Sequence, residues 1–178
     1  MPDDQGNPSV ISEIRMLLDR AVDRLTAAGA RDEALAEYVA ERRTLLIPRK
    51  PVMKPIGRVW RLGVFLLGAD GSLYETGSTN RALEPGRPGY QSVSAEPRRE
   101  YRAAATRGRF AHGETVNFDA RLVDLDAESL RSSTGRLFVD GDRPRVRWNT
   151  TAGDAEAVEL SAYLADRVEL LADPPTGA

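Results

Sequence analysis

The spacing of apolar residues changes along this chain from a helical period to a period of two, and no other feature constrains the fold as much. In residues 9–28 apolar side chains recur every three or four positions, at Ile11, Ile14, Leu18, Ala21, Val22 and Leu25. This spacing gathers them on one face of an amphipathic helix. The outward face is expected to carry charged residues, namely Arg15, Asp19, Arg20, Asp23 and Arg24. Ser9 or Ser12 is the expected N-cap of that helix, and Gly29 is expected to end it.

A second helix is predicted over residues 32–46 and is expected to end before Pro48. One side of this helix would carry Leu35, Tyr38, Val39 and Leu46. Together the two helices predict an antiparallel helical hairpin in residues 1–46. Residues 47–56 contain Pro48, Pro51 and Pro55, which predicts a stiff, extended linker.

After the linker, apolar residues recur at every second position. Alternating apolar residues predict a strand over residues 58–67, with one face formed by Trp60, Leu62, Val64 and Leu66. Asp70-Gly71 is typical of a hairpin turn that returns into a second strand. The other expected strands are 72–76, 115–125, 136–139 and 143–148, and the other expected helices are 94–107 and 154–171. Residues 77–92 are expected to form a long loop, and Asp126 is expected to cap a short helical turn.

This order of elements predicts an α+β fold. Its antiparallel sheet would have helices packed on one face and would be preceded by the N-terminal helical hairpin. A chain of 178 residues suits one domain, so residues 57–178 should form an α+β domain that packs with the hairpin as one compact unit. The expected core includes Trp60, Leu62, Val64, Leu66, Val146 and Trp148.

Composition excludes several kinds of chemistry. The chain has no cysteine, which excludes disulfides, thiolate metal sites and cysteine nucleophiles. His112 is the only histidine, so a metal site with two or three imidazole ligands is excluded too. The glycine loops that bind nucleotides, G-x-x-x-x-G-K-[ST] and G-x-G-x-x-G, are absent. We therefore expect neither a metal site nor a cofactor.

Arginines supply the candidate binding residues. Arg98, Arg99 and Arg102 lie on the helix predicted over residues 94–107. A second group alternates with apolar residues and would share one face of a strand, namely Arg143, Arg145 and Arg147. Guanidinium groups bind carboxylates and phosphates in a bidentate manner. These six arginines and His112 are therefore candidates for an anion-binding site, and a solvated outer face is the alternative.

The charge distribution indicates which partners to expect. Residues 58–111 hold nine basic and five acidic side chains, whereas residues 112–178 hold seven and thirteen. Such an asymmetry can guide association with an acidic protein, but a net charge of −2 argues against a nucleic-acid binder. The acidic N-terminus and the short apolar stretch 63–68 predict no leader and no membrane span. We expect a cytoplasmic protein.

Two segments resemble a known family. Residues 57–77 (GRVWRLGVFLLGADGSLYETG) and 108–126 (GRFAHGETVNFDARLVDLD) are similar to a family of small uncharacterised actinobacterial proteins, some of which carry the label glutaminase. Serine-dependent glutaminases use S-x-x-K, yet neither Lys50 nor Lys54 has a serine three residues before it. Only Ser78-Thr79-Asn80 resembles a second motif of those enzymes, S-x-N. The residues do not support the label.

Three functions remain open at this level. The first is a non-catalytic binding or regulatory module for an anionic small molecule or an acidic protein surface. The second is an amide hydrolase in which folding brings together Ser78, His112 and a carboxylate such as Asp119. The third is a homo-oligomer, such as a homodimer, assembled through the amphipathic N-terminal helices.

Overall fold

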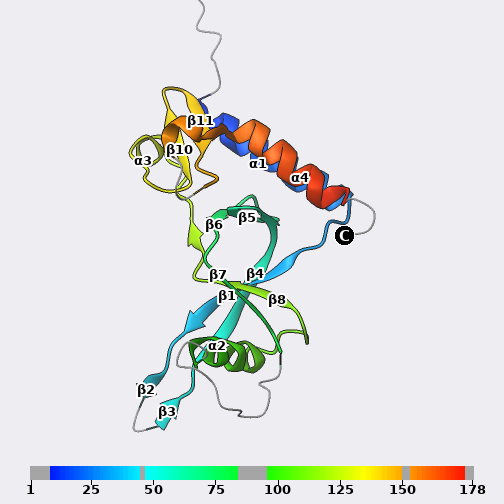
Figure 1. Ribbon diagram of the computed structural model, residues 1–178, viewed down its shortest axis with the longest axis vertical. Helices are drawn as coiled ribbons and strands as arrows, with labels where there is room; N and C mark the ends of the chain where they lie inside the picture. Colours follow the sequence, from blue (N-terminus) through cyan, green and yellow to red (C-terminus); the bar gives the residue numbers. More distant parts are fainter. Residues whose placement is uncertain (1–8, 45–46, 84–95, 150–152, 175–178) are drawn as a thin grey trace, which may run out of the picture. The chain divides into compact units, whose positions relative to one another are not determined.

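The computed structural model describes residues 9–44, 47–83, 96–149 and 153–174 (Figure 1). Its helices are α1 (Val10–Ala27), α2 (Glu96–Arg107), α3 (Ala127–Arg131), α4 (Leu160–Ala172) and the 3₁₀ turn η2 (Asp154–Glu156). Its first strands are β1 (Glu33–Val39), β2 (Arg42–Thr44), β3 (Ile47–Arg49), β4 (Val52–Leu62), β5 (Phe65–Gly68) and β6 (Leu73–Glu75). They are followed by β7 (Ser78–Arg81), β8 (Thr115–Phe118), β9 (Arg121–Leu122), β10 (Leu137–Asp140), β11 (Arg143–Val146) and β12 (Val158–Glu159).

The chain forms two compact units. Unit 1 comprises residues 1–31, 60–75 and 122–178, and unit 2 comprises residues 32–59 and 76–121. In unit 2 the hydrogen-bonded strand order is β7-β8-β1-β4, and β5, β6 and β9 follow β4 in unit 1. The β1–β8 pair is parallel, while β1–β4, β5–β6 and β7–β8 are antiparallel. The fold is therefore α+β with a mostly antiparallel, mixed sheet.

Unit 1 is organised around α1, whose ends match the sequence prediction. The Ser9 side chain caps the helix by accepting a hydrogen bond from the Ser12 amide, and Gly29 follows the helix with a φ of +59°. Figure 1 shows α1 and α4 side by side. Between them and the strands of unit 1 lies a core that includes Ile14, Leu18, Leu25, Trp60, Leu62, Phe65, Leu67, Leu73, Val146, Leu160, Tyr163 and Val168.

Unit 2 has a separate core in which α2 packs on its strands. Small side chains dominate this core: Ala34, Ala36, Ala82, Ala104 and Ala105 are all buried, beside Met53, Val116 and Phe118. Alanines on both surfaces let the helix approach the sheet closely. The rings of Tyr38, Tyr101 and Phe118 complete the core, with centroids 4.8–6.3 Å apart.

The predicted helix over residues 32–46 is wrong. Residues 33–39 form β1, which pairs with β4 over seven residues and with β8 on its other side, and residues 42–44 form β2. Ala34 and Ala36 suit a helix by propensity, but the pairing satisfies the backbone on both edges and buries them against α2. The helical hairpin is therefore replaced by one helix and strands, and residues 45–46 lie outside the described residues.

The alternation of apolar residues correctly predicted strand structure over residues 58–67, but not the number or the bounds of the strands. The expected strand 58–67 is two strands, β4 and β5, with a reversal at Gly63 and Val64. β4 also begins earlier and includes residues 52–56 of the expected linker, and β3 includes residues 47–49. Trp60, Leu62 and Leu66 are buried as expected, whereas Val64 is half-buried because it lies in the reversal.

Several boundaries also differ from expectation. The region 115–125 holds two short strands, β8 and β9, and residues 154–159 form η2 and β12 before α4 begins. The expected loop 77–92 contains β7, and its residues 84–92 lie outside the described part of the chain. Val146 is fully buried, but Trp148 is wrong as a core residue, because it is 46% exposed and follows the end of β11.

Candidate ligand-binding pocket

The arginines of β11 are used mainly inside unit 1. Arg147 donates hydrogen bonds to the Asp154 carboxylate at 2.5 and 3.0 Å and to the carbonyl oxygens of Ser133 and Gly135 at 3.1 and 2.6 Å. Its guanidinium also lies 3.8 Å from the centre of the Phe138 ring. These partners take four hydrogen bonds from a group with five N–H donors, and the side chain is only 18% exposed, so Arg147 stabilises unit 1 and offers little to a ligand.

The other two arginines of β11, Arg143 and Arg145, also contact groups inside unit 1, but they make fewer contacts than Arg147. Arg145 donates to the Ala157 carbonyl oxygen and forms an ion pair with Asp140 at 3.5 Å. Arg143 is 76% exposed and reaches Glu159 at 3.4 Å. Since β12 pairs with β11, Glu159 and Ala157 lie next to this row of arginines. The acidic segment before α4 therefore neutralises the face that the sequence marked as an anion site.

The remaining sequence candidates lie in unit 2. Arg99 and Arg102 are exposed on α2 and make no side-chain hydrogen bond or ion pair within the part of the chain that the structure describes. The side chain of Arg98 lies outside the described residues. His112 is exposed in the turn after Phe110 and likewise has no side-chain partner among the described residues. Because the two arginine groups belong to different units, their union in one site stays a prediction.

The catalytic alternative can be compared with the geometry of unit 2. Ser78 lies on β7 opposite Phe118 and is exposed, and Asp119 follows β8 with a left-handed φ of 55°. Within the described residues no hydrogen bond joins His112 to Ser78 or to Asp119. A serine nucleophile needs a base within hydrogen-bond reach, so the structure supplies no support for that group.

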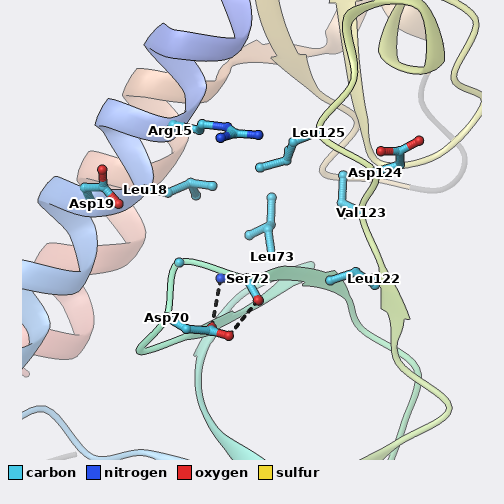
Figure 2. A pocket seen from close by; sticks show the side chains of 11 residues that line it. Arg15, Leu18, Asp19, Asp70, Ser72, Leu73, Leu122, Val123, Asp124 and Leu125 are labelled. Atoms are coloured by element: carbon cyan, nitrogen blue, oxygen red, sulfur yellow. Dashed lines mark hydrogen bonds between the residues drawn. The ribbon is translucent and has the colours of Figure 1, made fainter.

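Unit 1 contains a concave site. Its volume is about 570 Å³, which lies within the range of about 300–1,000 Å³ typical of small-molecule sites. The lining comes from α1, from the β5–β6 turn and β6, and from β9 and the segment that follows it (Figure 2). The lining residues are Arg15, Leu18, Asp19, Asp70, Gly71, Ser72, Leu73, Leu122, Val123, Asp124 and Leu125.

Local hydrogen bonds fix the β5–β6 side of this pocket. Asp70 accepts from the Ser72 amide at 3.0 Å and from the Ser72 hydroxyl at 2.9 Å, as Figure 2 shows. Gly71 takes a φ of +78°, a conformation that favours glycine. The Ser72 amide, followed by its hydroxyl, lowers the pKa of Asp70 below its usual value. Asp70 is therefore a fixed negative charge at the rim.

The opposite wall of the pocket, residues 122–125, is hydrogen-bonded to β6. The Val123 amide donates to the Leu73 carbonyl oxygen at 2.8 Å, which holds residues 122–125 beside β6. Asp124 accepts a hydrogen bond from Ser129 at 3.0 Å, and Asp126 caps α3, as its sequence position predicted. The wall is therefore built by backbone pairing and capping, while Leu122, Val123 and Leu125 supply its apolar surface.

The pocket is lined by two charged residues of α1. Arg15 and Asp19 lie one turn apart, and neither makes an ion pair or a side-chain hydrogen bond with the described residues. In Figure 2 the Arg15 and Leu18 side chains extend from α1 toward Leu125 and Leu73. An unpaired guanidinium beside apolar side chains is available to a ligand. Among the described residues no group of three or more His, Asp or Glu side chains is arranged to hold a metal ion.

Sequence reasoning missed this pocket. It assigned Asp70-Gly71 to a turn and Asp126 to a helix cap, both correctly, and it placed Arg15 and Asp19 on the outward face of the first helix. These elements are far apart in sequence, so only folding brings them together. Leu122 is 59% exposed, but this exposure is known only from the structure, and no local sequence pattern marks it.

Comparison with known proteins identifies no relative of this chain. No family model, no curated protein and no solved structure matches it. The structure also contains no described helix that has both the length and the apolar character needed to cross a membrane.

Proposed function

We propose that this protein is a non-catalytic binding module and that its ligand site is the pocket of unit 1. One observation supports this proposal above the others. An open cavity of about 570 Å³ joins an apolar wall to Arg15, whose guanidinium has no partner among the described residues. Pockets that bind small molecules combine an apolar lining with a few polar groups that fix orientation.

The lining favours a ligand with an apolar body and an anionic group. Leu122, Val123 and Leu125 supply accessible apolar surface, and burial of such surface contributes about 25 cal/mol per Å². Arg15 offers paired N–H donors to a carboxylate or phosphate. The anionic ligand expected from the arginine content thus has a structural candidate, but on α1 instead of β11.

Thermal denaturation of the full chain against apolar carboxylates, amines, neutral amides and zwitterionic apolar amino acids and dipeptides tests the proposal. A ligand present at a hundred times its dissociation constant should stabilise the fold by about 2.7 kcal/mol. Leu122→Asp should abolish the stabilisation, because it places a charge in the apolar wall at an exposed position. Leu170→Asp, also exposed but on α4, is the control and should respond like the wild type. If no compound stabilises the protein beyond an inert-salt control, the proposal is rejected.

A second candidate is supported by α2. Arg99 and Arg102 are exposed and have no partners among the described residues, and unit 2 holds fourteen basic and nine acidic side chains. This surface of α2 suits an acidic protein partner. His112 belongs to the same unit and lies in the turn after Phe110. Binding of a polyglutamate probe, and its loss in Arg99→Gln/Arg102→Gln but not in Arg20→Gln, would support this candidate. Equal binding by both variants would remove it.

A further inference from the structure

The charges around the pocket are separated into two ends. Arg15 provides a positive charge on α1, and Asp19 lies one turn further along the same helix. A β-carbon at Gly71 would stand 3.6 Å from Asp19 Oδ1, so the Asp19 carboxylate flanks the turn that contains Asp70. The carboxylates of Asp19 and Asp70 therefore both border Gly71. The guanidinium of Arg15 comes from a position one turn before Asp19 on α1.

This separation disfavours a purely anionic ligand. The lining holds one guanidinium and three carboxylates, those of Asp19, Asp70 and Asp124. Asp70 and Asp124 already accept hydrogen bonds from Ser72 and Ser129, whereas Asp19 has no partner among the described residues. A ligand that brings only a negative charge would satisfy Arg15 but would be repelled by the carboxylates. A ligand with both charges satisfies Arg15 and Asp19 together.

The spacing of the two free charges indicates the length of such a ligand. An α-helix rises about 1.5 Å per residue, so the attachment points of Arg15 and Asp19 are about 6 Å apart along the axis. An extended dipeptide spans at most about 7 Å between its ends. Its two charged termini can therefore reach one charge each, while its side chains lie on Leu122, Val123 and Leu125.

We propose that the pocket binds short apolar peptides with free termini, two or three residues long, with the carboxylate on Arg15 and the ammonium group at Asp19 and Asp70. This inference rests on the proposed function, because it names the ligand class of the same pocket. It requires that both terminal charges contribute to affinity. It also requires that each contribution depends on a different residue of α1.

Isothermal titration of the full chain with four leucyl-leucine peptides tests this inference. The peptides are the free dipeptide, its N-acetyl form, its C-terminal amide and the form blocked at both ends. Hydrogen bonds to charged groups are the stronger class, so blocking either terminus should weaken binding about tenfold. Arg15→Gln should remove the penalty of C-terminal amidation alone, and Asp19→Asn should reduce the penalty of N-acetylation alone.

Charge-matched controls come from the same helix. Arg20→Gln and Asp23→Asn change exposed residues of α1 that do not line the pocket, and both should bind all four peptides as the wild type does. Equal affinity for free and blocked peptides, or no measurable heat with any of them, overturns the inference. If the blocked peptides bind equally and Leu122→Asp abolishes that binding, the pocket remains the ligand site and only recognition of the two charges is rejected. The proposed function fails separately, if no compound of the denaturation series stabilises the protein.

Discussion

Gly63 and Tyr163 form a close contact in unit 1 that makes a sharp test of the packing. Gly63 reverses the chain between β4 and β5 with a φ of +63°, and a β-carbon there would overlap the Tyr163 hydroxyl oxygen. That hydroxyl donates to the Leu62 carbonyl oxygen at 3.0 Å and accepts from the Val64 amide at 2.8 Å. The Tyr163 side chain, which comes from α4, therefore forms hydrogen bonds with the backbone on both sides of the reversal.

Gly63→Ala should destabilise unit 1 for two separable reasons. A left-handed conformation costs a residue with a β-carbon about 1 kcal/mol. Displacing the Tyr163 hydroxyl should also break both hydrogen bonds, at about 1 kcal/mol each. We expect a total of about 3 kcal/mol. Gly141→Ala is the matched control, because Gly141 has a φ of +62° but nothing within 4 Å of the added carbon, and should cost about 1 kcal/mol.

A double-mutant cycle isolates the contact. Tyr163→Phe alone should cost about 2 kcal/mol through the two lost hydrogen bonds. In that background Gly63→Ala should cost only about 1 kcal/mol, which gives a coupling energy of about 2 kcal/mol. Tryptophan fluorescence during urea denaturation measures unit 1, because both tryptophans, Trp60 and Trp148, belong to it. The reasoning fails if Gly63→Ala costs the same in both backgrounds or no more than Gly141→Ala.

Three further predictions concern polar contacts. Arg147→Met should destabilise unit 1 by about 2–4 kcal/mol, because two part-buried carbonyl groups and the Asp154 carboxylate lose their donor. Arg143→Met, at a position that is 76% exposed, should change stability by less than about 0.5 kcal/mol in the same fluorescence assay. Asn117 is 1% exposed and donates to the Ala34 carbonyl oxygen, so Asn117→Ala should destabilise unit 2 by about 2 kcal/mol in circular dichroism melts; an unchanged melt would contradict this. A hydrogen bond from Arg58 lowers the pKa of Asp32. The ionised Asp32 carboxylate therefore stabilises the fold at neutral pH, and this stabilisation is lost as pH falls through the lowered pKa. The stability difference between wild type and Asp32→Asn should therefore shrink below pH 3.8, and a difference that grows with acid would refute the assignment.

The sequence was sufficient where local chemistry decides the structure. Ser9 and Gly29 bound α1, Asp126 caps α3, and Asp70-Gly71 forms the turn before β6, all as predicted. In each case a side chain or a glycine satisfies a neighbouring backbone group, so residues a few positions apart contain all the information. Periodicity also identified the α+β class, because helical and strand spacings differ.

Tertiary pairing decided what local preference could not. Residues 33–39 have the composition of a helix, yet they form β1 because β4 and β8 offer hydrogen-bonding partners on both sides. Gly63 looked like one position in a long strand, and only the Tyr163 hydroxyl on α4 shows why the chain reverses there. Such partners lie tens of residues away, and no local pattern encodes them.

The candidate site shows the same division. Composition directed attention to arginine, but it could not distinguish an arginine with internal partners from one that is available. Arg147 is occupied by Asp154 and by two carbonyl groups, whereas Arg15 has no partner among the described residues and faces an apolar wall. Both residues have the same chemistry in the sequence. Their difference arises from what folding places within hydrogen-bond distance, and that is a property of the tertiary structure alone.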